Sequence, residues 1–208
     1  MNKIVIGIDQ SYNRTGITVL DNKRIIIMKS VNYEGCKNNT DKRKYITNTL
    51  FEIMDMLDSN GINNPHYITV ICERIRLKSQ GFINENYLKS TGALVATIID
   101  FFYEYDIPVY SVDTRSWKSQ IVGNSKPLNN SYGINPEKYR TILYLKSKGL
   151  LKYIVEEYKG RGKKGVINVK MKGKRVPCKI NDDLADSYCI AMYGFLPEDK
   201  QKLKEEKF

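Results

Sequence analysis

Four acidic side chains lie at sequence positions that folding is expected to bring close together. Asp9 ends the apolar run KIVIGID, and Glu73 ends a second apolar run, YITVICE. Asp183 and Asp186 are three residues apart in NDDLADSYCIA, so a helix carries both on one face. Taken alone, each of the two acids at a strand end is also explained by a strand that simply ends at the solvent-exposed surface. Helix capping accounts for Asp182 but not for Asp186, which lies inside the apolar repeat, so the pattern indicates a shared chemical task.

Clustered carboxylates suit hard divalent cations such as Mg²⁺. Two such ions about 3.5–4 Å apart activate a water and stabilise the leaving oxygen when a phosphodiester is hydrolysed. A zinc site of the usual kind is not expected, because His66 is the only histidine and the four cysteines form no C-x-x-C pair. We therefore expect a site built from acids alone, with two Mg²⁺ ions and Mn²⁺ as a substitute.

Hydrophobic periodicity predicts three strands in a meander, followed by alternating helices and strands. The predicted strands are residues 3–9, 14–21, 24–31, 67–71 and 107–112, and the predicted helices are residues 42–57, 84–105, 136–149 and 182–193, with another beginning at Trp117-Lys118. This order predicts an α/β protein with one mixed five-stranded sheet and helices on both faces, which resembles the ribonuclease-H-like fold. Ligands collect at the carboxyl ends of strands in such sheets, which brings Asp9 and Glu73 together.

The positive charge of the chain is concentrated in one segment. The sequence has 34 Lys and Arg against 23 Asp and Glu, a net charge of +11, and residues 158–180 hold nine of the basic residues and no acidic one. These nine are Lys159, Arg161, Lys163, Lys164, Lys170, Lys172, Lys174, Arg175 and Lys179. Glycines flank an alternating run there, which predicts a β-hairpin or a loop. The simplest interpretation is a solvent-exposed surface segment without a binding role. So many cations without acids nevertheless favour contacts with nucleic-acid phosphates.

A length of 208 residues fits one domain, with a basic insertion at about 158–180 and a charged tail at 197–208 expected as a helix or a frayed end. The sequence contains no run of about 18 apolar residues, so we expect no membrane span. The first residues do not have the pattern of a signal peptide. Scattered cysteines are typical of a reducing compartment, so we expect a cytoplasmic protein without a membrane partner.

The motifs that hold the acids resemble those of RuvC-type Holliday-junction resolvases. GIDQSYNRTG is similar to the family's opening GIDPG…RTG, ICE to its second strand end, and DLADS to its last helix. Trp117-Lys118 and Pro136-Glu137-Lys138 also resemble the family's pattern between these motifs. The resemblance implies that Asp9, Glu73, Asp183 and Asp186 occupy the four metal-binding positions. It further implies that Lys118 and Lys138 lie near the scissile phosphate, with Asp182 as an additional acid.

The resemblance implies a structure-selective endonuclease of DNA recombination and repair that cuts four-way and other branched junctions as a homodimer. The basic segment resembles diverged phage and viral members, so the host cytoplasm is the expected location. The helix at residues 84–105, with its small Gly92-Ala93 pair, is the candidate dimer interface or else an ordinary core helix. Arg76 stands where the bacterial enzymes have an aromatic residue and is a candidate DNA contact, while Phe82 or Tyr87 would either stack on a base or lie in the core.

Three other interpretations stay open on the sequence. A nuclease of the same fold would act on RNA–DNA hybrids, flaps or other branched DNA. A DNA-binding module without activity would not need all four acids. An ATPase of the actin and chaperone superfamily also opens with a strand that ends in an acid, but this chain is short for two lobes and lacks a second glycine-rich phosphate loop.

Overall fold

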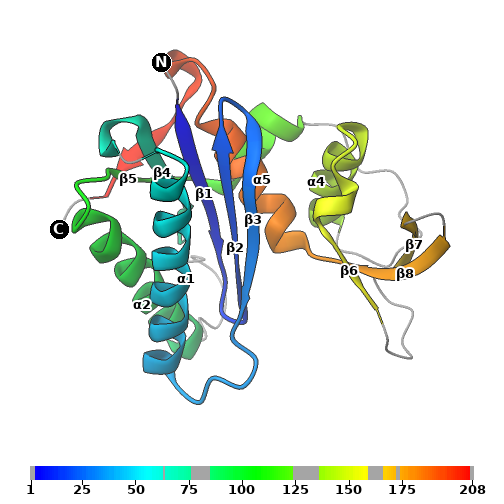
Figure 1. Ribbon diagram of the computed structural model, residues 1–208, viewed down its shortest axis with the longest axis horizontal. Coiled ribbons are helices and arrows are strands. Elements are labelled where there is room, and N and C mark those ends of the chain that lie inside the picture. Colours follow the sequence, from blue (N-terminus) through cyan, green and yellow to red (C-terminus); the bar gives the residue numbers. More distant parts are fainter. Residues whose placement is uncertain are drawn as a thin grey trace.

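The computed structural model describes residues 3–62, 64–75, 85–123, 136–158, 166–171 and 174–206, without the side chains of residues 86, 87, 136, 137, 167–171 and 175. Its main sheet has the strand order β3-β2-β1-β4-β5-β9 (Figure 1). The first five strands along the chain are β1 (Ile4–Gln10), β2 (Arg14–Asp21), β3 (Arg24–Asn32), β4 (Ile68–Glu73) and β5 (Val109–Val112). The first three form an antiparallel meander, and β1, β4 and β5 run parallel, which confirms the predicted mixed sheet.

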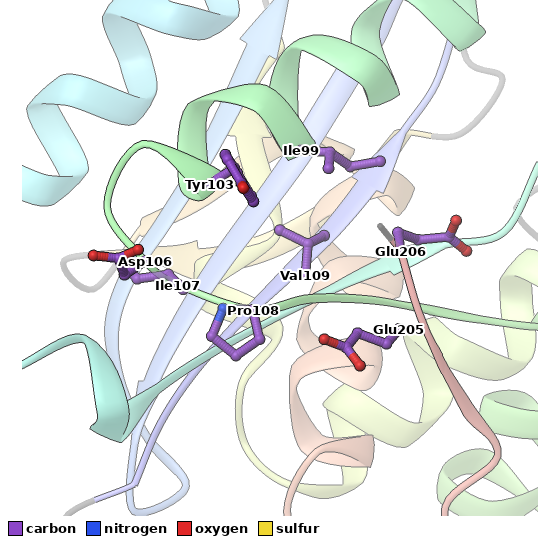
Figure 2. A pocket seen from close by; sticks show the side chains of 8 residues that line it. All are labelled: Ile99, Tyr103, Asp106, Ile107, Pro108, Val109, Glu205 and Glu206. Carbon is purple, nitrogen blue, oxygen red and sulfur yellow. The ribbon is translucent and has the colours of Figure 1, made fainter. Parts of the chain in front are cut away.

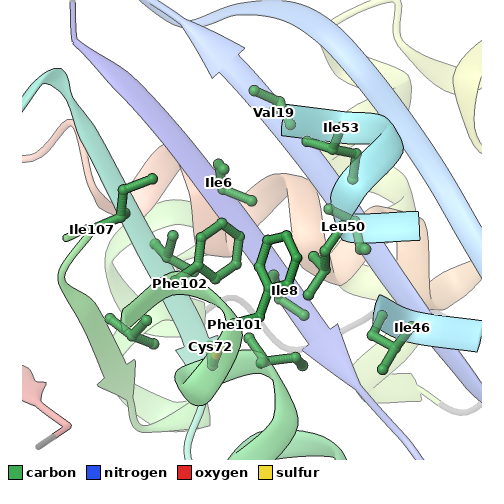
Figure 3. Close-up of a cluster of buried hydrophobic side chains, with 14 of the residues drawn as sticks. Ile6, Ile8, Val19, Ile46, Leu50, Ile53, Cys72, Phe101, Phe102 and Ile107 are labelled. Carbon is green, nitrogen blue, oxygen red and sulfur yellow. The ribbon is translucent and has the colours of Figure 1, made fainter. Parts of the chain in front are cut away.

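The alternation of side chains along the strands separates two hydrophobic cores. Ile4, Ile6 and Ile8 of β1 face one core, where they meet α1 (Asn39–Ser59) and α2 (Glu85–Tyr103), as Figure 3 shows for part of the cluster. Residues of the other parity face a second core. That core is covered by α4 (Pro136–Ser147) and α5 (Asp182–Tyr193), together with Trp117. The two faces of the sheet are thus buried by different helices, as predicted.

Two short elements follow β5 and lead the chain over the second core. They are α3 (Thr114–Trp117) and a π-helical turn, η2 (Lys118–Val122). Asp113 caps α3 by accepting a hydrogen bond from the Arg115 amide at 2.9 Å. The helix predicted to begin near Trp117 is therefore present, although it is short and its π-helical turn is wider than that of an ordinary α-helix.

The basic segment forms the antiparallel hairpin that was one of its two predicted forms. Strands β7 (Val166–Met171) and β8 (Lys174–Ile180) pair with each other, and a short strand that the sequence did not predict, β6 (Val155–Glu157), pairs with β8. In Figure 1 this small sheet lies beyond α4, away from the main sheet. Because β8 ends one residue before the Asn181 cap of α5, the hairpin leads directly into the helix that carries Asp183 and Asp186.

The prediction for the tail was wrong, and the main sheet has six strands where five were expected. After a 3₁₀ turn, η4 (Glu198–Lys200), the chain forms β9 (Leu203–Glu205), which pairs antiparallel with β5. Leu203 is the single apolar residue of this strand, so alternation was too weak to reveal it. In the described part of the chain, no helix has the length and apolar character needed to cross a bilayer.

Candidate active site

Asp9 and Glu73 project from the same face of the sheet, near its carboxyl edge. On β1, Ile8 faces the α1 and α2 core, so Asp9 belongs to the opposite parity and faces α5. Cys72 of β4 pairs with Ile8 and faces the α1 and α2 core as well, which gives Glu73 the orientation of Asp9. The hydrophobic pattern of two neighbouring parallel strands thus brings the two acids side by side.

Helix α5 lies directly against these strands because two glycines leave room for its backbone. A Cβ atom on Gly16, the partner of Asp9 across β1 and β2, would overlap the Asp183 carbonyl and lie 2.9 Å from the Leu184 amide nitrogen. A Cβ atom on Gly7 would lie 2.8 Å from Ala191 Cα. An isolated glycine inside a strand is a known signal of such a close approach. This contact sets the distance of the α5 acids from Asp9.

The amino end of α5 is fixed by Asn181. Its side chain accepts a hydrogen bond from the Leu184 amide at 3.2 Å and donates one to Glu156 at 2.8 Å. A second buried link joins the helix to the sheet, since the hydroxyls of Thr18 and Ser187 are hydrogen-bonded at 2.8 Å. The α5 acids are therefore held by a cap and by a polar contact with the sheet.

Two donors hold the carboxylate of Glu73. The Thr114 hydroxyl donates to Oε1 at 2.7 Å, and the indole Nε1 of Trp117 donates to Oε2 at 3.0 Å. Trp117 is fully buried, so its N–H position is set by core packing. The sequence pointed to Trp117 only as part of a motif and gave no sign of Thr114. Both are positioning residues for Glu73.

Asp186 has one oxygen beside a cation and one without a hydrogen bond of normal geometry. Its Oδ2 lies 3.7 Å from Lys118 Nζ, which also lies 4.9 Å from the centre of the Trp117 ring. Its Oδ1 is buried and makes no hydrogen bond of normal geometry among the described residues, although the Thr141 hydroxyl lies near enough to oppose the rise in the pKa of Asp186. A buried carboxylate oxygen in that state is costly unless another group coordinates it. Lys118 and Asp186 thus lie close together.

The remaining predicted residues of the site also come together. Lys138 of α4 forms an ion pair with Asp182, and Arg14 Nε lies 4.0 Å from Asp183 Oδ2. Burial acts to lower the pKa of Lys138, but Asp182, Asp183 and Asp186 outweigh it and raise that pKa. Arg14 is a site residue that the sequence analysis did not single out, although it lies in the opening motif.

The acids raise one another's pKa values. Burial, followed by the charges of Asp186, Glu73 and Asp183, raises the pKa of Asp9 well above its ordinary value. Burial and neighbouring acids raise the pKa of Asp186 to about 7 and that of Asp183 to about 6, against the opposing effect of nearby cations. Carboxyl groups that share a site behave in this way when no cation compensates their charge.

The donor set fits hard divalent cations. All four acids are oxygen donors, and Asp186 Oδ1 is an unsatisfied buried acceptor in their midst. Within the described residues, no three acidic, histidine or cysteine side chains converge closely enough to surround one ion. The carboxylates of Glu73, Asp186 and Asp182 are instead turned toward Trp117, Lys118 and Lys138, respectively. Ion binding at these residues therefore requires the side chains to exchange protein partners for metal.

The raised pKa values predict that the metal-free protein loses stability as the pH rises. The folded protein retains protons on Asp183 and Asp186 that the unfolded chain has lost, so the free energy of unfolding falls between about pH 4 and pH 7 by roughly 2–4 kcal/mol. Thermal unfolding in a chelator across this range measures the effect. The Asp186→Asn variant should show a shallower decline, and an equal decline in both proteins would contradict this assignment.

Replacing Trp117 by Phe should weaken metal binding while the fold persists. Phe keeps most of the packing but cannot donate to Glu73, and loss of such a supporting hydrogen bond typically costs about 10–100-fold in metal affinity. Calorimetric titration with Mn²⁺ measures the change. Phe102→Leu, at a buried position in the other core, controls for lost packing. Equal Mn²⁺ affinity in the two variants would show that Trp117 acts only as a core residue.

Most predicted DNA-contacting residues lie outside the described part of the chain. This holds for Arg76, Lys159, Arg161, Lys163, Lys164 and Lys172, and for the side chains of Lys170 and Arg175. Phe82 and the side chain of Tyr87 lie outside it as well. Lys174 and Lys179 are described, and both are exposed on β8. The hairpin backbone thus agrees with the prediction, while the DNA contacts stay a prediction.

The architecture is similar to that of known junction-resolving enzymes. One match is RuvC from T. thermophilus in complex with a Holliday junction substrate, with a TM-score of 0.57 and 14% identity over 98% of this chain and 99% of that chain. A further Thermus thermophilus RuvC structure matches with a TM-score of 0.51 and 15% identity over 91% of each chain. No protein-family model and no curated protein sequence matches the chain. The chain therefore has the RuvC-type fold, as its motifs predicted.

Proposed function

We propose that this protein is a metal-dependent DNA endonuclease that cuts four-way and other branched junctions. The observation that carries this proposal is the cluster of Asp9, Glu73, Asp183 and Asp186, which three separate elements bring to one edge and one face of the sheet. The similarity in fold to RuvC bound to a Holliday junction, over almost the full length of both chains, supports the choice of substrate.

In this proposal the four acids hold two Mg²⁺ ions, or Mn²⁺ in their place. The ions would supply an activated water and neutralise charge on the leaving oxygen. Thr114 and Trp117 keep Glu73 oriented toward the site, and the Gly16 contact keeps Asp183 and Asp186 within reach of Asp9. The raised pKa values of the acids support this assignment, since they mark a cluster whose charge the nearby cations compensate only in part.

Lys118 would act on the phosphate. Its ammonium lies 3.7 Å from Asp186 and over the Trp117 ring, and its side chain is mostly buried. Once a cation neutralises Asp186, Lys118 can turn to a phosphate oxygen and stabilise the negative charge that develops there during hydrolysis. Lys138, which pairs with Asp182 on the same side of α5, would serve as a second contact to the DNA backbone.

The basic hairpin would bind a duplex arm of the junction through its phosphates. Lys174 and Lys179 are exposed on β8, which continues into α5, so a duplex on the hairpin would be coupled to the helix that carries the metal site. Phosphate contacts of this kind add affinity and salt dependence but little sequence preference. We assign this DNA contact to the whole segment at residues 158–180.

A homodimer would place two such sites on the two strands that a four-way junction offers. The face formed by α1 and α2 supports this part of the proposal, because Phe51, Tyr103 and Tyr105 are large aromatic residues that are exposed there. We infer that this face includes the dimer interface. We also propose that the protein acts in DNA recombination and repair, in the cytoplasm of a cell that a phage has infected.

A panel of DNA and RNA substrates tests the proposal. Purified protein with Mg²⁺ should cut a synthetic four-way junction in preference to an RNA–DNA hybrid and a flap built from the same sequences. Faster cutting of the hybrid would assign the protein to a different nuclease class on this fold. Tight junction binding without cutting in Mg²⁺ or Mn²⁺ would assign it to the non-catalytic DNA-binding proteins.

A further inference from the structure

We propose that a basic pocket beside the candidate active site binds a phosphate of the DNA backbone, and that the C-terminal tail exists to complete it. This proposal rests on the proposed function for its choice of ligand. We call it the tail pocket. It has a volume of about 210 Å³ and is lined by Arg115, Ser116, Ser119, Gln120, Tyr193, Lys200 and Lys202. The first four residues come from α3 and η2, and the last two precede β9.

Strand pairing puts the tail pocket at the catalytic edge of the sheet. Leu203 is the first residue of β9 and pairs with Val112, the last residue of β5. The residues before Leu203 therefore lie at the carboxyl end of β5, which neighbours the carboxyl end of β4 and Glu73. On the other side of the pocket, Arg115 follows Thr114, whose hydroxyl donates to Glu73. Because Thr114 and Trp117 face Glu73 while Arg115 and Ser116 line the pocket, a DNA strand that extends past Glu73 would reach the pocket on the far side of α3.

The tail is anchored so that its two lysines project outward. The hydroxyl of Tyr193, which is fully buried at the end of α5, accepts a hydrogen bond from the Lys202 amide at 2.7 Å and donates to the Lys200 carbonyl at 3.3 Å. Between them, the half-buried Gln201 donates to the carbonyls of Gly194 at 3.2 Å and Leu196 at 2.5 Å. Lys200 and Lys202 are exposed. The backbone is thereby fixed, while both ammonium groups stay available to a ligand.

The chemistry of the lining fits a phosphate. Three cationic side chains, the hydroxyls of two serines and of Tyr193, and one amide surround the pocket, and none of the described residues that line it is acidic. Charged and hydroxyl donors in this combination are those that bind backbone phosphates in protein–DNA contacts. A contact to a backbone phosphate would be independent of the base sequence.

The tail carries acids on both sides of Lys200 and Lys202, but of its described charged residues only these two line the tail pocket. Glu205 and Glu206 follow the lysines, and they line a different pocket together with Asp106 at the far end of β9 (Figure 2). Ser111 donates to Glu206 at 2.5 Å and accepts from Arg74 Nε at 3.1 Å, so the acidic end is occupied in holding the sheet together. Glu205 and Glu206 thus lie away from the tail pocket, while Glu198 and Asp199 directly precede Lys200 and are exposed.

The experiment compares two double variants that remove equal charge. In the tail pocket, Lys200→Gln is combined with Lys202→Gln. The control combines Lys23→Gln with Arg24→Gln, which are exposed at the turn between β2 and β3, at the opposite edge of the sheet. Binding of a labelled four-way junction is measured in chelator over a range of salt concentrations, so that no cleavage occurs.

The tail-pocket variant should lower the slope of log affinity against log salt by about 1, since each lost phosphate contact lowers it by about 0.9. The control should keep the parent slope. Equal slopes in the two variants would overturn the proposal. A tail-pocket variant that loses pyrophosphate binding but keeps the parent's affinity for DNA would overturn it as well. If the parent binds the junction but cuts nothing, the proposed function fails while the slope comparison still decides on the pocket.

Discussion

Replacing Asp9 by Asn should abolish metal-dependent cleavage and at the same time stabilise the metal-free protein. Asp9 is surrounded by the charges of Asp186, Glu73 and Asp183, which raise its pKa together with burial. A neutral amide removes this repulsion but is a poorer ligand for two cations. We expect a loss in cleavage rate of about 10³-fold or more, since metal catalysis supplies several kcal/mol and each 1.36 kcal/mol is tenfold in rate.

Single-turnover cleavage and thermal unfolding in chelator measure the two effects. The free energy of unfolding at neutral pH should rise, because the neutral amide removes the repulsion that raises the pKa of Asp9. Asp58→Asn, at an exposed position of α1, should change neither quantity. Cleavage within tenfold of the parent would remove Asp9 from the proposed metal site, and an unchanged stability would show that the acids do not repel one another in the fold.

Replacing Gly16 by Val should damage both the fold and the site. The Cβ atom would overlap the Asp183 carbonyl, and the backbone of α5 cannot yield without moving Asp183 and Asp186 away from Asp9. Overpacking of this kind costs about 1–3 kcal/mol or more, and the β-branched side chain adds further bulk. We therefore expect a lower unfolding temperature and a loss of Mn²⁺ binding at temperatures where the variant is still folded.

Gly92→Ala is the matched control for this substitution. Gly92 lies inside α2, and no described atom lies within 4 Å of the position that its Cβ would take. Ala in a helix interior is favoured over Gly by roughly 1 kcal/mol, so this variant should be more stable than the parent. The outcome that would contradict the role of Gly16 is a Gly16→Val protein with the stability and Mn²⁺ affinity of the parent.

The open surroundings of Gly92 also correct an expectation. The small Gly92-Ala93 pair suggested a close approach of another element, but within the described residues the close approaches occur at Gly7 and Gly16. The two strand glycines follow the rule that a glycine inside a strand marks a nearby backbone. Composition shows that a residue is small, whereas only the tertiary arrangement shows which small residue is covered.

Sequence patterns were most informative where one periodicity acts over a whole element. The apolar runs KIVIGID and YITVICE predicted two buried strands, and the position of Asp9 and Glu73 at the strand ends predicted that the two acids lie together. The spacing of Asp183 and Asp186 predicted one helix face, and α5 carries both beside the sheet. Local periodicity therefore predicted the main sheet and the meeting of the acids.

The parts that the sequence did not predict depend on contacts between distant segments. Thr114 and Trp117 hold Glu73 from about forty residues away, and a hydroxyl or an indole has no periodic signature. Strand β9 contains one apolar residue and exists because β5 offers it an unpaired edge. Lys200 and Lys202 likewise gain a role only through that pairing, so charge counts alone could not distinguish them from solvated lysines.

Cleavage of a four-way junction beside a linear duplex of the same sequence tests the central claim most directly. Both DNAs are labelled and incubated with the parent protein in Mg²⁺, and again in Mn²⁺, under single-turnover conditions. The account predicts cuts in the junction strands at a rate far above that of the linear duplex, with no cutting in chelator. Equal cutting of the two DNAs, or no cutting with either metal, would contradict it.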